Sequence, residues 1–158
     1  MKIAVFAGSF DPFTIAHEDL VLRGLNLFDK IIVAVGVNSA KKGLLPHHIR
    51  EQAIREVFQS NERVEVRQFS GLTVSFCEQV GASYMLRGLR NTNDFEFENA
   101  IAQNNAQLSP AVETYFLMAK SGLAHISSTI VRDILGNGGD VSALVPRSLL
   151  PYLSAGED

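Results

Sequence analysis

The sequence has little of what marks several classes of protein. It contains a single cysteine, Cys77, in 158 residues, which excludes an intramolecular disulfide and a cysteine metal cluster, so we expect Cys77 to be a small core residue on a helix. Lys and Arg number 14 against 17 Asp and Glu, for a net charge of −3, whereas nucleic-acid-binding surfaces are usually strongly basic. No apolar run approaches the length of a membrane span, and Asp11-Pro12 comes too early for a signal peptide. We therefore expect a cytoplasmic protein that has neither nucleic acid nor a membrane as a partner.

What the chain does contain is a regular alternation of apolar runs and amphipathic segments. The apolar runs predict five strands, near residues 3–6, 30–37, 64–68, 84–86 and 113–118. Helical spacing between and after them predicts helices following residue 14, following residue 46, over 73–80, over 92–108, over about 130–135 and over 146–153. Strands that alternate with helices imply βαβ units with right-handed crossovers. The predicted fold class is therefore α/β, as a single domain over residues 1–158 with a doubly wound, mostly parallel five-stranded sheet and a frayed tail over 154–158.

The stretch from Gly8 to His17 follows the first predicted strand. Gly8 permits close approach of the backbone, and Pro12 fixes φ and stiffens the turn. Thr14 is a candidate helix N-cap, which would put His17 in the first turn of the next helix. A histidine there lies beside free backbone N–H groups and the positive end of the helix dipole, an arrangement that suits a phosphoryl group. The alternative interpretation is an ordinary strand-to-helix turn with a surface histidine.

Four polar segments follow predicted strands and should meet at one edge of the sheet, where open α/β sheets bind ligands. They are Ser9 to His17, Lys41 with Lys42, Arg87 with Arg90, and Ser127-Ser128-Thr129. An acidic protein that gathers basic and hydroxyl groups at one rim is most simply explained by a small polyanionic ligand.

Each segment also has a plainer interpretation. The two lysines could form a solvated loop, and Ser127 could be an N-cap only. Arg87 and Arg90 could simply pair with Asp94 and Glu98, acids that could themselves serve only to cap a helix.

Taken together, the motifs resemble those of the bacterial phosphopantetheine adenylyltransferases, in the nucleotidylyltransferase superfamily. The shared segments are Gly-Ser-Phe-Asp-Pro with Thr-x-x-His, Lys-Lys, Arg-Gly-Leu-Arg-x-x-x-Asp-Phe-Glu-x-Glu, and Ile-Ser-Ser-Thr-x-Val-Arg, in the family's order over nearly the whole chain. The sequence departs from the family at Ile15, at Ala16 in place of a glycine, and at Leu123 in a position that is often aromatic.

The resemblance implies a Rossmann-like nucleotidylyltransferase fold and the transfer of AMP from ATP to 4′-phosphopantetheine, which yields dephospho-coenzyme A and pyrophosphate. It also implies Mg²⁺ as cofactor and a homohexamer, and we assign no protein side chain as a metal ligand. The resemblance gives catalytic roles to His17, Lys41 and Arg90. It implies contacts with phosphopantetheine for Ser9, Lys41, Thr73 and Arg87. It implies contacts with ATP for Ser9, Phe10, His17, Gly88, Leu89, Arg90, Glu98, Leu123, Ala124, His125, Ile126, Ser127, Ser128 and Thr129.

A mechanism that fits these residues needs no protein nucleophile, because the phosphate monoester of the acceptor is itself an anion that can attack in line. The protein then has to supply positioning and charge stabilisation. His17 would donate to the α-phosphate, Lys41 would bridge the reacting phosphates, and Arg90 would hold the departing phosphates. Two alternatives remain open: a nucleotidylyltransferase with another acceptor, such as nicotinamide mononucleotide or glycerol 3-phosphate, and a nucleotide-binding sensor that does no chemistry.

Overall fold

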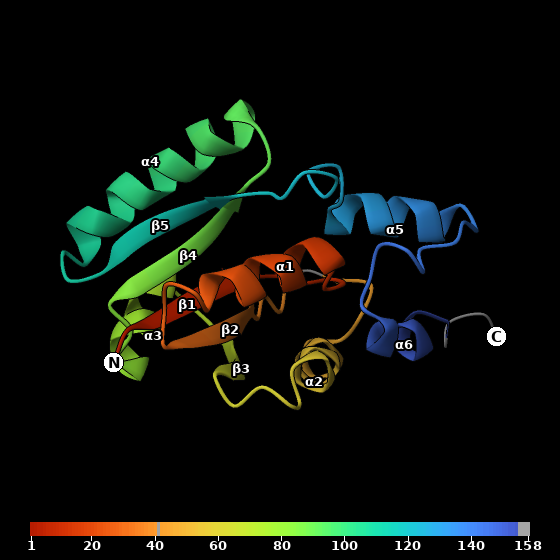
Figure 1. The fold of residues 1–158 in the computed structure, drawn as a ribbon, viewed down its shortest axis with the longest axis horizontal. Helices are drawn as coiled ribbons and strands as arrows, with labels where there is room; N and C mark the ends of the chain where they lie inside the picture. The colour runs from red at the N-terminus through yellow and green to blue at the C-terminus, as the bar shows by residue number, and fades with distance from the viewer. Residues whose placement is uncertain (41, 155–158) are drawn as a thin grey trace.

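A parallel β-sheet runs through the molecule with helices on both of its faces (Figure 1). The computed structural model describes residues 1–40 and 42–154. The strands are β1 (Ile3–Gly8), β2 (Lys30–Gly36), β3 (Val64–Phe69), β4 (Tyr84–Leu89) and β5 (Glu113–Met118). The helices are α1 (Ile15–Gly24), α2 (His47–Val57), α3 (Thr73–Val80), α4 (Thr92–Leu108), α5 (Ser128–Gly136) and α6 (Leu150–Ser154), with a 3₁₀ turn (Arg147–Leu149) before α6.

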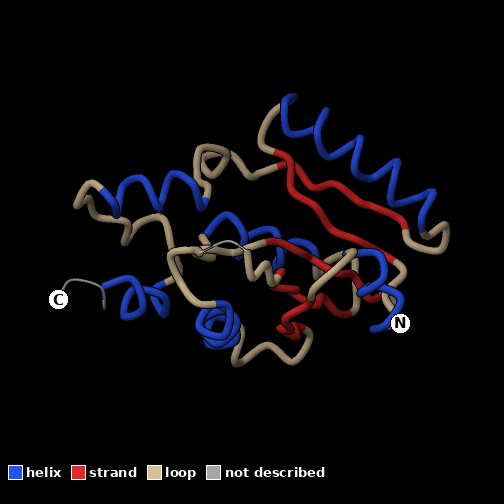
Figure 2. The backbone as a smooth tube through the Cα atoms, turned by 180° about the vertical axis from the view of Figure 1, so that it is seen from behind, coloured by secondary structure: helices blue, strands red, loops and turns tan. Residues whose placement is uncertain are grey.

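The strand order is β3-β2-β1-β4-β5, and every neighbouring pair is parallel. This confirms the predicted α/β class and the doubly wound, five-stranded sheet. Seen from behind, α4 lies along the β4–β5 end of the sheet, while α5 and α6 lie at the opposite end of the molecule (Figure 2). Ser154 closes α6 instead of beginning the expected tail, and the rest of that tail, residues 155–158, lies outside the described residues.

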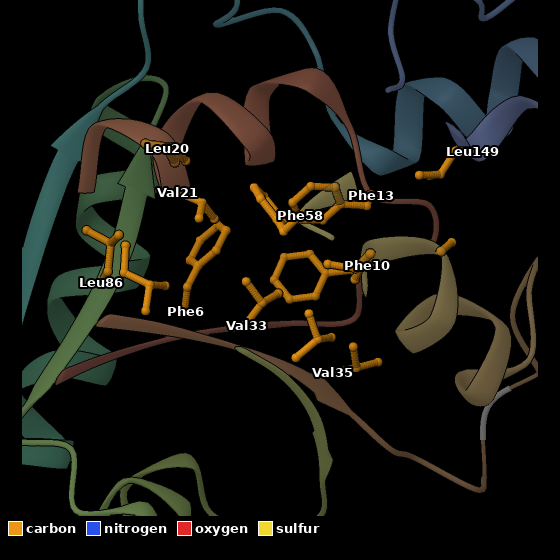
Figure 3. Close-up of a cluster of buried hydrophobic side chains, with 14 of the residues drawn as sticks. Phe6, Phe10, Phe13, Leu20, Val21, Val33, Val35, Phe58, Leu86 and Leu149 are labelled. Atoms are coloured by element: carbon orange, nitrogen blue, oxygen red, sulfur yellow. The ribbon is translucent and has the colours of Figure 1, made fainter. Parts of the chain in front are cut away.

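Both faces of β1 and β2 are buried, because successive side chains of a strand point to opposite sides and helices cover each side. From β1, Ala4 and Phe6 join one apolar cluster, which α1, α2 and α5 cover; part of this cluster is drawn in Figure 3. Val5 and Ala7 join the other cluster, which packs against α3. Cys77 lies in that second cluster, fully buried on α3, as predicted. Burial of a full valine, leucine or phenylalanine side chain contributes about 1.5–3 kcal/mol, so these two layers hold the sheet edge in a fixed place.

The two central strands, β1 and β4, separate toward their carboxyl ends. β1 pairs with β2 as far as Gly8↔Val35, but its pairing with β4 ends at Val5↔Met85. β4 nevertheless continues, because its pairing with β5 extends to Leu89↔Met118. The sheet therefore opens between β1 and β4, where the chain order reverses, and this is where α/β sheets bind ligands.

β4 is longer than the sequence predicted. The predicted strand ended at residue 86, with Arg87 and Gly88 in a loop after it, whereas both belong to the strand and only Arg90 follows it. Arg87↔Phe116 and Gly88↔Leu117 are pairs across the β4–β5 ladder, so tertiary pairing overrides the loop-like character of Arg-Gly-Leu-Arg.

Helix boundaries follow the predicted caps closely. Thr14 is the N-cap of α1 and its hydroxyl accepts from the backbone N–H of His17, and Ser127 is the N-cap of α5 and accepts from the N–H of Ile130. Both caps satisfy N–H groups that lack a partner within the helix. None of the helices described for residues 1–40 and 42–154 combines the length and apolar character that crossing a membrane requires.

Candidate active site

A cavity of about 360 Å³ opens where β1 and β4 separate. Its walls come from the carboxyl ends of β1 and β4, from α1, from the segment after β5 and from the start of α5. The residues predicted to contact ATP that line it are Ser9, Phe10, His17, Gly88, Arg90, Leu123, Ile126, Ser127, Ser128 and Thr129. Ala16, where the family has a glycine, also lines this cavity.

A second cavity, of about 310 Å³, lies on the other side of the end of β1. It is lined by the described residues predicted to contact phosphopantetheine, namely Ser9, Thr73 and Arg87. Four residues line both cavities: Ala7, Gly8, Ser9 and Arg87. The carboxyl end of β1, together with one arginine of β4, is thus the common wall at which ligands in the two cavities would meet.

His17 is held by the same hydrogen bonds that begin α1. The backbone N–H of Thr14 donates to Nδ1 of His17 at 3.0 Å, and the backbone N–H of His17 donates to Oγ1 of Thr14 at 3.3 Å. These bonds form a capping box in which histidine takes the usual place of Glu or Gln. Because Nδ1 accepts from a backbone N–H, the proton of the neutral ring is on Nε2, which leaves Nε2–H as a donor.

The surroundings of the His17 ring keep it neutral. Its centroid lies 5.1 Å from that of Phe10 and 5.3 Å from that of Phe13. Burial, together with the positive charges of Arg87 and Arg90, lowers the pKa of His17 to about 4, and burial is the largest of these causes. At neutral pH the side chain is therefore an uncharged hydrogen-bond donor.

Two acids of α4 hold the two arginines of the site. Nε and Nη2 of Arg87 donate to the carboxylate of Glu98 at 2.9 and 2.6 Å, and Nη1 donates to the carbonyl of Ala7 at 2.5 Å. Nε and Nη2 of Arg90 donate to the carboxylate of Asp94 at 2.9 and 3.2 Å. The hydrogen bond from Arg90 lowers the pKa of Asp94, and the same pairing raises the pKa of Arg90. The pairing that the sequence left open is thus formed, and each guanidinium retains N–H groups beyond those bonds, since it has five.

The start of α5 is tied to the turn that follows β1. Oγ of Ser128 donates to the carbonyl of Pro12 at 2.8 Å, and Nη1 of Arg132 donates to the carbonyl of Asp11 at 2.7 Å. The first turn of a helix offers N–H groups without helical partners and the positive end of the dipole, which together favour an anion. This helix end therefore faces the same cavity as His17.

Some predicted residues are not brought to the cavity. Leu89, Glu98, Ala124 and His125 do not line it, so their contact with ATP stays a prediction. Lys41 lies outside the described residues. Conversely, Lys120 and Arg132 line the cavity although the sequence analysis gave them no role. The signal was present for both, because Lys120 closely follows a strand and Arg132 ends the Ile-Ser-Ser-Thr-x-Val-Arg motif.

Within the described part of the chain, no three His, Cys, Asp or Glu side chains come together in a way that could hold a metal ion. Two acids line the larger cavity, and both pair with arginines: Asp19 with Arg23 at 2.9 Å and Asp94 with Arg90 at 2.9 Å. Nucleotide-associated Mg²⁺ is usually held by one or two carboxylates together with substrate phosphates and water, and Asp19 and Asp94 are the carboxylates that line this cavity.

The chain is similar to known proteins over most of its length. The family model described as cytidylyltransferase-like matches residues 5–134. The phosphopantetheine adenylyltransferase of Flavobacterium psychrophilum is 48% identical over 149 residues, covering 94% of this chain and 98% of that protein. The phosphopantetheine adenylyltransferase of Geotalea daltonii is 43% identical over 155 residues, covering 98% and 96%.

A solved structure gives the same fold. The crystal structure of a putative nicotinate-nucleotide adenylyltransferase from Vibrio parahaemolyticus superposes with a TM-score of 0.71, covering 97% of this chain and 99% of the other. At 20% sequence identity the likeness concerns the fold alone.

The fold, the two cavities and the matched family model together define the class: the chain belongs to the cytidylyltransferase-like family and is a nucleotidyltransferase. Within that class, relatives 43–48% identical over most of its length show that it belongs to the phosphopantetheine adenylyltransferases. It is therefore an enzyme.

Proposed function

We propose that the chain transfers AMP from ATP to 4′-phosphopantetheine, giving dephospho-coenzyme A and pyrophosphate, as a step of coenzyme A biosynthesis. The observation that carries this proposal is the meeting of two cavities at Ala7, Gly8, Ser9 and Arg87. Transfer between two phosphate-bearing substrates requires that their phosphates be held next to each other in line. A shared wall that carries a glycine, a hydroxyl and a guanidinium supports such an arrangement.

The larger cavity takes ATP in this proposal, and the smaller takes the acceptor. The larger one contains His17, Arg90 and the start of α5, which suit a triphosphate. The smaller one contains Thr73 and reaches the larger at Arg87, so an acceptor phosphate placed there would lie beside the α-phosphate of ATP.

The reaction proceeds by direct displacement. An oxygen of the acceptor phosphate forms a bond to the α-phosphorus, while the bond from that phosphorus to the oxygen bridging to the β-phosphate breaks and pyrophosphate leaves. Nε2–H of His17 donates to an α-phosphate oxygen as negative charge develops there. Lys41 bridges the reacting phosphates, and Arg90 with the first-turn N–H groups of α5 holds the phosphates that leave. No covalent intermediate with the enzyme forms.

Mg²⁺ enters this site on the phosphates of ATP in our proposal. Carboxylates near the triphosphate, such as that of Asp94, are engaged with arginines, so the protein would contribute orientation of the phosphates more than metal ligands. When bound, Mg²⁺ neutralises part of the phosphate charge.

The test is release of pyrophosphate with a panel of phosphorylated acceptors. We expect ATP- and Mg²⁺-dependent release with 4′-phosphopantetheine and little release with nicotinamide mononucleotide or glycerol 3-phosphate. Equal or reversed rates between 4′-phosphopantetheine and nicotinamide mononucleotide would reject the acceptor, and binding of ATP without release for any acceptor would favour a non-catalytic sensor.

We also propose that the chain assembles as a homohexamer. Large apolar side chains remain exposed on α4, where Phe97 is 69% and Leu108 is 60% exposed. Beside them, the edge strand β5 exposes Tyr115 and Met118, at 43% and 74%. Extended exposed apolar surface of this kind is typical of protein interfaces, and a second copy of the chain is the partner that the resemblance supplies. A cytoplasmic location stays a prediction from the sequence.

A further inference from the structure

A buried ion pair joins the turn after β1 to helix α2. Asp11 and Arg50 are each only 5% exposed, and Nη2 of Arg50 lies 3.2 Å from Oδ2 of Asp11. The carboxylate also accepts from the backbone N–H groups of Leu44 and Leu45, at 2.7 and 2.8 Å. Nε of Arg50 donates to the carbonyl of Leu45 at 2.8 Å. The pair thus binds the segment of residues 42–45 against the turn of residues 9–12.

Arg50 also reaches the shared wall of the two substrate cavities directly. Its Nη1 donates to the carbonyl of Ser9 at 3.2 Å. A third cavity, of about 370 Å³, lies beside the ion pair and includes Asn38 and Lys42 in its lining. Ser9 is the one described residue that lines all three cavities. The position of its backbone therefore governs how the three spaces meet.

The backbone next to Ser9 is strained, so it needs external support. Phe10 has φ of 49°, in the left-handed region that bulky side chains rarely adopt. Such conformations persist only where the surroundings hold them. Arginines bond to the carbonyls on both sides of Phe10, since Arg50 donates to that of Ser9 and Arg132 to that of Asp11.

The space between Gly43 and the ion pair is fully used. A Cβ on Gly43 would collide both with the guanidinium of Arg50 and with the carboxylate of Asp11. The glycine lets the segment of residues 42–45 pass directly over the ion pair, and any side chain there would displace one of the two charged groups.

We propose that Arg50 is a positioning residue for nucleotidyl transfer. It fixes the Ser9 backbone and the segment of residues 42–45 relative to the cavity that contains His17 and would take ATP. Arg50 lines neither substrate cavity, and the N–H groups for which partners are described go to Ser9, Asp11 and Leu45. The inference rests on the proposed function. Because His17, Arg90 and the start of α5 would hold ATP without help from Arg50, its loss acts on alignment more than on ATP binding.

The test compares two matched substitutions, Arg50→Lys and Arg63→Lys. Arg63 is a suitable control because its guanidinium also donates to carbonyls, those of Leu25, Phe28 and Asp29, and does not line the substrate cavities. Arg50→Lys keeps a positive charge beside Asp11 but removes the fork that reaches Ser9 and Leu45. A displacement of about 1 Å at a reacting centre can cost roughly a hundredfold in rate, so we expect kcat to fall at least tenfold. The Kd and stoichiometry of ATP binding should stay within threefold of the parent.

Arg63→Lys should lower the unfolding temperature while kcat stays within twofold of the parent. Gly43→Ala provides a second variant that leaves Arg50 and Asp11 in the sequence, and we expect it to show the same loss of kcat with ATP binding retained. It decides the matter if Arg50→Lys does not fold.

Three outcomes separate this inference from the proposed function. If the parent releases pyrophosphate but Arg50→Lys keeps kcat within threefold, the positioning role is rejected and the proposed function stands. If the Kd for ATP weakens in parallel with kcat, Arg50 maintains the nucleotide cavity as a whole and the inference is again overturned. If the parent is inactive with every acceptor, the proposed function fails first and the inference falls with it.

Discussion

At the scale of single residues, His17 joins helix formation to chemistry. Its Nδ1 accepts from the backbone N–H of Thr14 as part of the capping box of α1, and that bond leaves the proton on the atom that would face a phosphate. Local sequence could predict this much, because Thr-x-x-His gives both the cap and the position of the histidine. The electrostatic state of the ring could not be predicted, since it depends on burial against Phe10 and Phe13 from the preceding turn.

Two substitutions at His17 separate its role in capping α1 from its proposed role in catalysis. His17→Ala should lower kcat roughly a hundredfold or more, as loss of a transition-state donor typically does, and it should lower stability by about 1 kcal/mol through the weakened cap. His17→Gln restores the capping box and so should regain the stability without regaining the rate. Steady-state kinetics and urea unfolding of both variants check this. A loss that appeared chiefly in KM for ATP would make His17 a ground-state binder instead.

The lowered pKa of His17 also predicts a pH dependence of stability. Burial, with the charges of Arg87 and Arg90, lowers the folded-state pKa to about 4, whereas an unfolded histidine titrates near 6.5. Between these values the unfolded chain binds a proton that the folded chain does not, so His17 costs stability as pH falls through that window. From pH 7.5 to 4.5 the parent should therefore lose more unfolding free energy than His17→Gln, as measured by urea titrations. Parallel losses in the two proteins would contradict the burial of the ring.

At the scale of elements, α4 supports the site by holding two of its arginines. Asp94 and Glu98 lie one turn apart, and each carboxylate holds a different arginine, the first that of Arg90 and the second that of Arg87. Glu98 itself does not line either substrate cavity. Three described bonds take N–H groups of Arg87, and because a guanidinium has five, two remain for a phosphate.

Glu98→Gln tests whether this orientation matters. The amide cannot accept from both Nε and Nη2 of Arg87, so the guanidinium should lose its fixed plane and bind an acceptor phosphate less well. We expect KM for the acceptor to rise severalfold, with KM for ATP little changed. Glu96→Gln, an exposed acid on the same helix, is the matched control and should behave as the parent does. A tighter acceptor KM in Glu98→Gln would instead mean that the carboxylate competes with the phosphate.

The same elements indicate how far the sequence could predict the structure. Strands and helices were predictable where apolar periodicity and a cap agree, as in α1 and α5. The prediction failed at Arg87 and Gly88, because their place in β4 depends on the β4–β5 ladder, which local sequence does not display. Arg50 was missed for a similar reason: nothing local distinguishes it from the other arginines, and only the fold brings it to Asp11.

At the scale of the whole molecule, the site lies at the opening of the sheet while the exposed apolar surface lies elsewhere. α4 and β5 form one end of the molecule (Figure 1). Side chains of these two elements contact each other, as Phe95 does with Phe116 at a centroid distance of 6.1 Å, although Phe95 is itself 46% exposed. Phe97 and Met118, by contrast, are among the most exposed apolar side chains described. Burying apolar surface contributes a favourable free energy of roughly 25 cal/mol per Å². These side chains would gain that free energy if the chains associated through this surface.

This surface predicts how the proposed homohexamer can be broken. Phe97→Glu places a charge where an interface would have to be dry, so it should shift the sedimenting species from six chains toward smaller assemblies. Leu27→Glu is the control, because Leu27 is also exposed, at 51%, but lies in the turn after α1 and belongs to neither α4 nor β5. Sedimentation velocity over a range of concentrations distinguishes the two variants. If the parent sediments as a monomer, the hexamer is wrong; if both variants dissociate alike or neither does, the interface lies on another surface. Should Phe97→Glu dissociate and still turn over, each chain would carry a complete site, as the two cavities built from one chain's residues lead us to expect.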